Sequence, residues 1–451
     1  MGQLFQQTTN EYRTDVGYST HYQPQLHPHR LAIAAALSGR APFDPGQPFT
    51  MFDLGCGFGL TTLCHAAAYP DARFIGIDAR PAHVAWASEV ADVAGLTNAS
   101  FVCSTFETLT RVHLPPSDII AAHGVWSWVG DETRRHIRTI AARCLAPDGV
   151  MYVSYNALPG LAAMLPIRQR LYDSFGRIEG PLEDRIQLAF AEVRRELTPE
   201  HPMSEQLEQL ARAPPAYLAH EFFNEHWRCF HAHEVADEMS HIGLGYIGPA
   251  DLADGLDPNR APDFRADLFS RADHAAGRPR TMADVVCALT IGAESFGHVS
   301  MPDPTARRLM HRLQRAPASA AQIGRESLFA TVTGEILESA MLSLLAGHVA
   351  DPVLDAAALE RRRERTDRLN RALWTQALVS DEVNVAVSPV TGAAVHTTRL
   401  EQLFLSALVR QEDMVDYAAG ILDVGQRPSI AAAASRFTAQ RLPLLASLGV
   451  V

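Results

Sequence analysis

Short apolar runs alternate with amphipathic segments between about residues 28 and 156. Five runs have the length and near-continuous hydrophobicity of buried parallel strands, and they lie at 50–54, 73–78, 100–103, 118–122 and 150–155. Helices are predicted before and between them, at 28–37, 59–68, 81–94 and 131–144. Strands that alternate with helices in this way indicate an α/β domain with a doubly wound sheet.

The chain changes character after Gly160. Residues 161–245 are mostly helical in pattern, and 248–263 is rich in Asp, Pro and Gly, which is typical of a loop. The apolar stretch 285–291 is a candidate returning strand of the first domain, in which case 161–245 is an insertion or a lid. From about residue 305 the helical pattern resumes.

We therefore predict three parts. Residues 1–160 form an N-terminal cap and a Rossmann-like α/β domain, residues 161–300 a helical middle domain, and residues 305–451 a mainly helical C-terminal domain. In the last part, Glu360–Arg371 is a run of charges that we interpret as a solvated helix face rather than a binding patch. Residues 383–395 are a candidate hairpin.

A glycine-rich turn follows the first predicted strand. Gly55, Gly57 and Gly59 let the backbone turn tightly and let a ligand approach the main chain without meeting a Cβ. The helix after this turn offers free N–H groups to an anionic ligand group. Asp78 ends the second strand, 23 residues after Gly55, and can accept both hydrogen bonds of a ribose diol. The turn and the acid indicate a site for a nucleoside-bearing cofactor.

Two classes of cofactor compete for this turn. A dinucleotide fingerprint requires G-x-G-x-x-G/A, and Leu60 occupies the sixth position counted from Gly55. The glycines instead follow G-x-G-x-G, with Asp53 two residues before the first. This spacing resembles motif I of the class I S-adenosylmethionine (SAM) methyltransferases. The resemblance implies SAM as the cofactor, with Asp53 helping to hold its amino-acid end.

Ligands of open parallel sheets bind beyond the carboxyl ends of the strands, so residues that follow each strand are candidates for chemistry. Thr105 and Phe106 follow the third strand and are placed to flank an adenine ring. Tyr155 and Asn156 end the fifth strand at the same edge of the sheet.

The segment after the fourth strand holds two of the chain's five tryptophans. Trp126 and Trp128 stand two residues apart beside His123, which could accept a proton. Ordinary core packing is one interpretation of the pair. The other is an aromatic wall around the transferring methyl group, because a sulfonium or an ammonium is stabilised over an aromatic face.

Composition limits the substrates and the cellular compartment that we expect for this protein. The 451 residues carry a formal net charge of −12, so we do not expect nucleic acid as a substrate, whereas an acidic surface favours a cationic one. The six cysteines include no C-x-x-C pair, and residues 1–15 contain no apolar core of a signal peptide. No apolar run is long enough to span a membrane. We therefore predict a cytoplasmic protein. His220 and His226 do not have H-E-x-x-H spacing, so no metal is predicted.

Further phrases are similar to bacterial class I methyltransferases that carry a methyltransferase regulatory domain, of which rickettsial protein lysine methyltransferases are the best described. They are Tyr18-Ser19, His27–Leu31, His123–Val129, Val153–Gly160 and, for the second domain, residues 217–222 and 243–248. The resemblance implies a SAM-dependent protein lysine N-methyltransferase acting on a protein or peptide, and it permits a homodimer.

The strand-end positions and the resemblance together assign candidate roles. The candidate catalytic residues are His123, Trp126, Trp128 and Tyr155. The candidate cofactor-binding residues are Asp53, Gly55, Gly57, Gly59, Asp78, Thr105, Phe106 and His123. The candidate contacts to the methyl acceptor are Tyr18, Tyr22 and Asn156.

Two other functions stay open at this point. The helical block after Gly160 could enclose a small pocket, which fits a methyltransferase for a small molecule or a peptide natural product. A SAM-binding sensor or scaffold without turnover needs the same intact cofactor site. Methyl transfer into a protein or into a small molecule separates the first two functions, and turnover separates both from the third.

Overall fold

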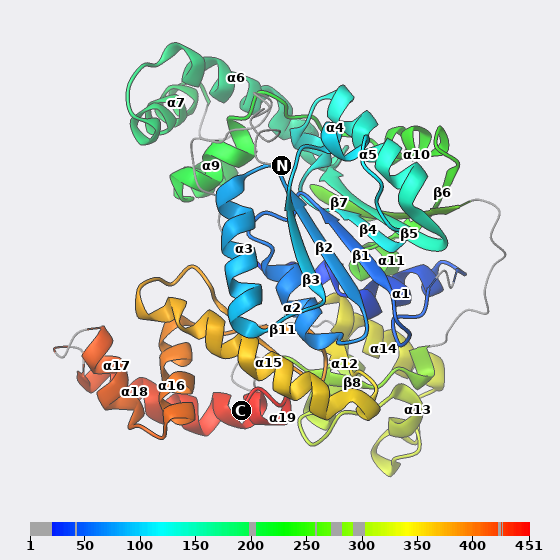
Figure 1. Ribbon diagram of the computed structural model, residues 1–451, viewed down its shortest axis with the longest axis vertical. Helices are drawn as coiled ribbons and strands as arrows, with labels where there is room; N and C mark the ends of the chain where they lie inside the picture. Colours follow the sequence, from blue (N-terminus) through cyan, green and yellow to red (C-terminus); the bar gives the residue numbers. More distant parts are fainter. Residues whose placement is uncertain are drawn as a thin grey trace.

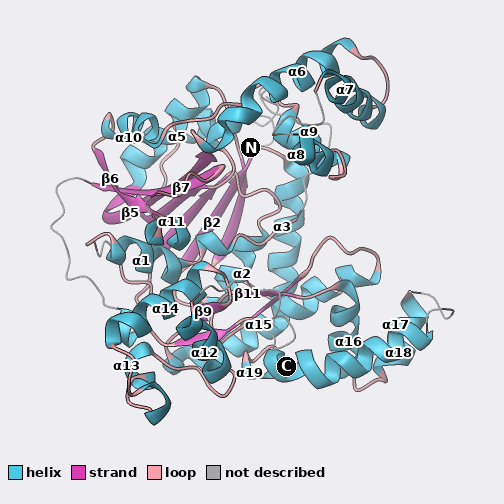
Figure 2. Ribbon diagram, turned by 180° about the vertical axis from the view of Figure 1, so that it is seen from behind, coloured by secondary structure: helices cyan, strands magenta, loops and turns pink. Residues whose placement is uncertain are grey.

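The computed structural model describes residues 20–40, 43–197, 204–257, 259–271, 282–291, 303–422, 425 and 427–451. A seven-stranded sheet lies at its centre, in the order β3-β2-β1-β4-β5-β7-β6 (Figure 1; magenta in Figure 2). The strands are β1 (Thr50–Leu54), β2 (Arg73–Asp78), β3 (Ala99–Cys103), β4 (Ser117–Ala122), β5 (Leu145–Asn156), β6 (Leu244–Pro249) and β7 (Phe264–Arg271). Strands β1 to β5 are parallel, β7 is antiparallel to β5, and β6 is antiparallel to β7. The predicted Rossmann-like sheet is confirmed.

Helices cover both faces of the sheet, as the alternating pattern predicts. One face packs against α5 (Asp131–Cys144) and α10 (Ala232–Ser240). The other packs against α1 (Pro28–Leu37), α2 (Leu60–Ala68) and α3 (Pro81–Ala94). Met51 and Phe52 are neighbours in β1 but belong to different hydrophobic clusters, because successive side chains of a strand point to opposite faces.

The last two strands of the sheet come from residues for which the sequence predicted a helical domain and a loop. Strands β6 and β7 lie between 244 and 271, inside the predicted helical middle domain. The stretch 285–291 does not join the sheet, because its strand β8 (Cys287–Leu289) pairs with β9 (Ala350–Pro352). Arg265 and Asp267 interrupt the apolar pattern of β7, which is why the sequence did not predict that strand.

Strand β5 differs from the prediction at its beginning. It starts at Leu145 instead of residue 150, and Pro147-Asp148-Gly149, which have turn chemistry, lie within it. The pairing of β4 with β5 shifts register between Ser117 and Ile119, beside these three residues. The turn residues are therefore accommodated as an irregularity in the strand.

Four helices after β5 form a separate helical lobe, which we define as residues 164–222. They are α6 (Met164–Arg177), α7 (Leu182–Glu196), α8 (Ser204–Leu210) and α9 (Pro215–Phe222). Their buried side chains, among them Leu171, Phe190 and Leu218, form a hydrophobic cluster of their own. In Figure 1 the lobe lies above the sheet, on the opposite side of the molecule from the C-terminal helices.

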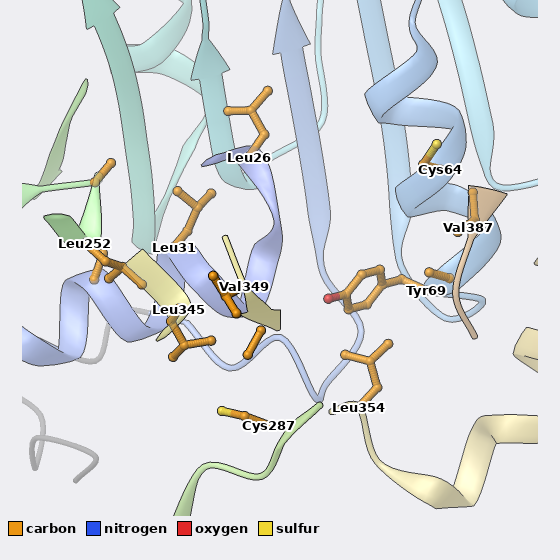
Figure 3. Packing of buried hydrophobic residues seen from close by; sticks show 14 of the residues in the cluster. Leu26, Leu31, Cys64, Tyr69, Leu252, Cys287, Leu345, Val349, Leu354 and Val387 are labelled. Atoms are coloured by element: carbon orange, nitrogen blue, oxygen red, sulfur yellow. The ribbon is translucent and has the colours of Figure 1, made fainter. Parts of the chain in front are cut away.

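The C-terminal part is mainly helical, as predicted, and the expected hairpin is present as β10 (Val385–Val387) and β11 (Ala394–His396). Its longer helices are α12 (Pro304–Leu313), α14 (Gly334–Ala346), α15 (Leu359–Trp374), α16 (Arg399–Arg410), α17 (Met414–Ile421), α18 (Arg427–Arg436) and α19 (Leu442–Ser447). Figure 3 shows Tyr69 of the sheet domain close to Leu354 and Val387 of this part. One continuous hydrophobic cluster therefore joins the two.

The charge run on α15 is not a purely solvated face, which corrects the interpretation from the sequence. Arg361 makes two 2.8 Å hydrogen bonds to Asp71, and Arg365 donates to the side chain of Asn98 and to a carbonyl of α2. Buried Arg362 donates to backbone carbonyls of its own part of the chain. Two turns of the run therefore bind the α/β domain.

The described residues contain no helix with the length and apolar character that crossing a bilayer requires.

Candidate functional site

A cavity of about 570 Å³ lies at the carboxyl ends of β1, β2, β4 and β5. The glycine-rich turn forms one wall, and the helical lobe covers the opposite side with Met164, Leu210, Tyr217 and Phe222. Parallel sheets place their ligand sites at this edge, so the cavity is where the strand-end residues were expected to act.

The glycine turn between β1 and α2 is shaped by contacts behind it and is open in front. Gly55 and Gly59 have φ of 81° and 65°, and a Cβ would lie 2.5 Å from Val125 and 2.4 Å from Phe101 respectively. Gly57 has φ of 55°, and a Cβ there would meet nothing within 4 Å. Gly55 and Gly59 are thus required by packing, whereas Gly57 leaves space beside the cavity.

Asp53, at the end of β1, is a buried carboxyl in the cavity wall. Its Oδ2 accepts a 2.8 Å hydrogen bond from the hydroxyl of Thr62 in α2. Burial raises the pKa of Asp53 to about 6, although the Thr62 hydrogen bond acts in the opposite direction. The carboxyl therefore needs a cationic or hydrogen-bonding partner to be stable in its ionised form.

Asp78 stands at the tip of β2, across the glycine turn from Asp53. Its Oδ2 accepts the N–H of Gly57 at 3.0 Å, and its Oδ1 accepts the N–H of Arg80 at 2.9 Å. His83 of α3 lies 3.3 Å from Oδ1, and its ring packs 4.2 Å from the ring of Phe58. Backbone donors thus fix the carboxylate at the cavity edge, next to an aromatic pair.

Thr105 and Phe106 follow β3 and line the same part of the cavity. Thr105 is the N-cap of the short helix α4 (Phe106–Leu109), and its hydroxyl accepts the N–H of Thr108 at 3.2 Å. The hydroxyl is therefore engaged in starting the helix. Its structural effect is to direct Phe106 toward the glycine turn, where Phe106 lies near Gly55.

His123 lies at the end of β4 and lines the cavity. Its Nδ1 is 2.8 Å from the hydroxyl of Tyr152 in β5, and the two rings are stacked. Burial lowers the pKa of His123 to about 4, so the imidazole is neutral at pH 7. A neutral imidazole can form a hydrogen bond to a substrate, but it is a weak base.

The two tryptophans after β4 have different environments. Trp128 lines the cavity and packs against Phe264, with 6.3 Å between ring centroids. Trp126 is fully buried in the cluster under α5 and does not line the cavity. The aromatic wall expected from the pair therefore contains only Trp128, and the core interpretation applies to Trp126, because the short 3₁₀ turn at 126–128 directs the two rings differently.

Tyr155, predicted as a catalytic residue, is also fully buried and does not line the cavity. Its hydroxyl donates to buried Asp267 of β7, so the side chain is engaged inside the protein. Asn156, the next residue, does line the cavity because side chains alternate along β5. The sequence located the end of the strand correctly, but of its two candidates there only Asn156 lines the cavity.

Of the two N-terminal tyrosines expected to contact the acceptor, Tyr22 does not line the cavity. Tyr22 points into a buried cluster, where its hydroxyl is 3.3 Å from Nε2 of His65. Burial raises the pKa of Tyr22, as expected for a side chain enclosed between the two parts of the molecule. Tyr18 lies outside the described residues.

Several cavity residues were not predicted from the sequence. They come from the last helix of the lobe, from the segment that follows it and from the start of β7, and they are Tyr217, Glu221, Phe222, Trp227, Asp263 and Phe264. Because the sequence predicted helix and loop for these residues, nothing placed them at a sheet edge. No local signal in the sequence marks them, because their place at the cavity depends on the strand β7 that the pattern does not reveal.

The cavity is acidic. Among the described residues that line it, the acidic side chains outnumber the single guanidinium of Arg80, and they are Asp53, Asp78, Glu107, Glu132, Glu221 and Asp263. A low-dielectric cavity walled by one sign of charge favours ligands of the opposite sign. The electrostatics therefore favour cationic groups over carboxylates or phosphates.

Two family models match the chain. Residues 51–149 match a model described as "Methyltransferase domain", which covers β1 to the middle of β5 with the glycine turn, Asp53 and Asp78. Residues 214–288 match a model described as "Predicted methyltransferase regulatory domain", which covers the end of the lobe, β6 and β7.

Relatives and solved structures agree with these matches. An uncharacterized protein of Synechocystis sp. is 28% identical and covers 98% of this chain and 100% of its own length. A trans-aconitate 2-methyltransferase of Methylobacterium radiotolerans is 29% identical over 56% of this chain and 87% of its own length. The structure of PKMT2 from Rickettsia typhi in complex with AdoHcy is 16% identical, with a TM-score of 0.66, and covers 89% of this chain and 90% of that one. This last likeness extends the common fold to nearly the whole molecule.

Proposed function

We propose that this chain, a class I SAM-dependent methyltransferase with a methyltransferase regulatory domain, transfers methyl groups to lysine side chains of proteins. The observation that carries the proposal is the character of the cavity beside the glycine turn, which is acidic and partly aromatic. An acidic wall attracts an ammonium, and aromatic faces stabilise a cation while excluding water. The likeness in fold to PKMT2 is consistent with this substrate class.

The residues around the turn fit the cofactor. The space in front of Gly57 admits close approach of a ligand to the main chain, and the buried carboxyl of Asp53 lacks a cationic partner among its hydrogen bonds described here. We assign Asp53 to the ammonium of the cofactor's amino-acid end and Asp78 to the ribose hydroxyls. Phe106, in the wall beyond β3, would pack against the adenine.

SAM supplies a sulfonium-bound methyl carbon, which an amine attacks in line as the carbon–sulfur bond breaks. The protein has little covalent work to do, so positioning and exclusion of water account for the rate. In this proposal Trp128 and Phe264, which contact each other at the cavity, form the wall along which the lysine side chain lies. Glu221 and Asp263 attract its ammonium from outside.

The amine must be neutral when it attacks. Its usual pKa of about 10.4 means that deprotonation at pH 7 costs roughly 4–5 kcal/mol, and a poorly hydrated aromatic wall lowers that cost. The sequence suggested that His123 could accept this proton, but its pKa of about 4 makes the imidazole a poor proton acceptor. We assign His123 to a hydrogen bond that orients the amine, with the proton leaving to water before the attack.

A small-molecule acceptor is the second candidate. Two relatives described as trans-aconitate 2-methyltransferases match 56% and 27% of the chain. The cavity argues against a polycarboxylate of that kind, because its acidic side chains would repel it. A cationic small molecule remains compatible with the same wall.

Radiolabelled SAM added to a lysate of the cells that contain this protein separates the candidates. We expect label in protein bands with the wild-type enzyme and none with Asp53→Ala, because that variant lacks the carboxyl assigned to the cofactor. Label confined to the small-molecule extract would contradict the protein substrate. No transfer despite binding of SAM would favour a sensor.

A further inference from the structure

The segment matched by the regulatory-domain model contributes directly to the cavity. From residues 214–288 it provides six lining residues, which are Tyr217, Glu221, Phe222, Trp227, Asp263 and Phe264. The same segment contains β6 and β7, which complete the central sheet. Its side chains therefore share one cavity with the glycine turn instead of occupying a separate module.

The first half of this wall is fixed by a buried guanidinium. Arg168 of α6 donates to the backbone carbonyls of Phe222 and Asn224, at the end of α9. The same guanidinium lies 5.3 Å from the ring centre of Trp227, at which distance a cation–π contact is favourable. Arg168 thereby holds the turn after α9 and orients the indole that lines the cavity.

The backbone after Trp227 is joined to the ends of β4 and β5. The N–H of Arg228 donates to the carbonyl of Ser127 at 2.9 Å, and Phe230 exchanges hydrogen bonds of 2.9 Å with Asn156 and Leu158. Ser127 precedes Trp128, and Asn156 itself lines the cavity. The segment is thus locked to the residues that were assigned to the acceptor side of the site.

The second half of the wall is the start of β7 with Phe264. It is held by residues whose side chains lie on the other face of this strand from Phe264. In β7, Arg265 places its Nε 3.0 and 2.9 Å from the two carboxylate oxygens of Asp267, which also accepts the hydroxyl of Tyr155. Asp267 is fully buried, so this carboxylate is held by its partners. These contacts of Asp267 hold the start of β7 in place. There Phe264 reaches the cavity, with its ring centroid 5.7 Å from that of His123.

We infer that residues 214–264 form the acceptor-binding wall of the active site and determine which methyl acceptor is used, with Phe264, Trp227 and Glu221 as the specificity-determining side chains. The inference rests on the proposed function only in taking this cavity as the place of methyl transfer. It does not depend on whether the acceptor is lysine.

The wall residues and the residues proposed to hold the cofactor come from different segments of the chain, so each set can be changed without the other. The cofactor side consists of the glycine turn and the ends of β1 to β3, all outside 214–264. Changes in the wall should therefore raise the KM for the acceptor and leave the affinity for S-adenosylhomocysteine unchanged. Loss of that affinity would instead indicate a general structural defect.

The experiment measures methyl transfer from radiolabelled SAM at increasing lysate concentration, together with S-adenosylhomocysteine binding by calorimetry. We expect Phe264→Ala and Trp227→Ala to raise the apparent acceptor KM by about tenfold or more, with the dissociation constant of S-adenosylhomocysteine within about twofold of wild type. Phe264→Leu keeps an apolar side chain at the start of β7 and replaces Phe264→Ala in the experiment if that variant does not fold. We expect it to raise the acceptor KM by a smaller factor.

Glu221→Gln has a matched control in Glu225→Gln. Glu225 is exposed on the same segment and does not line the cavity, so only Glu221→Gln should raise the acceptor KM. Equal effects of the two variants, or an unchanged acceptor KM in all three wall variants, would overturn the inference. If the label enters a small molecule, the lysine proposal fails, and a raised KM for that molecule in the wall variants would still support the wall.

Discussion

At the scale of single residues, the glycines of the turn have different roles: Gly59 is required by packing, and Gly57 leaves space beside the cavity. Gly57→Ala and Gly59→Ala both place a side chain at positive φ, which costs about 1–2 kcal/mol. Only Gly59→Ala also drives its Cβ into Phe101. We expect Gly59→Ala to lower the melting temperature clearly more than Gly57→Ala, and Gly57→Ala to fold but bind SAM weakly. Thermal melts and calorimetry on both variants check this, and equal melting temperatures would contradict it.

Asp53 links stability to pH. Its folded pKa of about 6 is above the ordinary value of 3.8, so protonation stabilises the cofactor-free protein, and this contribution is lost as the pH rises through about 6. Asp53→Asn removes the cost of the buried charge. At pH 7.5 we expect the free energy of unfolding of the variant to exceed that of the wild type by up to about 3 kcal/mol. This difference should vanish near pH 4. Urea unfolding at both pH values measures it.

The same carboxyl predicts the pH dependence of cofactor binding. An ionised Asp53 is required for the assigned contact to the cofactor's ammonium, so wild-type affinity for S-adenosylhomocysteine should rise between pH 5 and 7 and level off above. Asp53→Asn should bind weakly with a flat profile over that range. A wild-type profile without a step near pH 6 would contradict the assignment.

At the scale of elements, α15 shows how a charged helix can be a contact. Arg365 donates to Asn98, whose amide in turn donates to three backbone carbonyls at the end of α2 and after it. Arg363 instead forms an ion pair with exposed Glu360 on its own helix. We expect Arg365→Ala to lower the free energy of unfolding by about 1–3 kcal/mol and Arg363→Ala by less than about 0.5 kcal/mol. Chemical denaturation of both variants is the test.

The elements that the sequence predicted are those with a strong local signal. Strands β1 to β4 and helices α2, α3 and α5 were located closely, because apolar runs and glycine or proline boundaries mark them. Strand β7 was not, since buried Asp267 and its partner Arg265 replace apolar residues in the middle of the pattern. Arg265 and the hydroxyl of Tyr155, on the neighbouring strand, together make that carboxylate tolerable in the core, and no local rule reveals such a pairing.

The same distinction applies to the site. Asp53, Asp78 and the glycines were placed by a motif whose spacing alone defines the turn. Trp126 and Tyr155 were assigned to the cavity because they lie near strand ends, but a 3₁₀ turn directs the ring of Trp126 into the core, and within β5 a shift of one residue reverses the face. The cavity residues between Tyr217 and Phe264, proposed to bind the acceptor, come later in the chain than all the predicted strands, and tertiary packing alone brings them to the cavity.

At the scale of the whole molecule, two of the three parts meet around the cavity. The sheet presents the residues proposed to hold the cofactor, the helical lobe covers them, and the C-terminal helices support the sheet from the opposite side through a shared hydrophobic cluster (Figures 1 and 3). The C-terminal helices contribute none of the described residues that line the cavity. Their contribution to activity is therefore expected through stability of the α/β domain.

The most direct test of the account is the chemical identity of the methylated product. Protein labelled by the wild-type enzyme with radioactive SAM would be hydrolysed completely, and its amino acids separated beside methyllysine and methylarginine standards. We predict that the label co-migrates with N-methylated lysine and is absent when Asp53→Ala replaces the enzyme. Label in another amino acid, or only in the small-molecule fraction, would contradict lysine methylation.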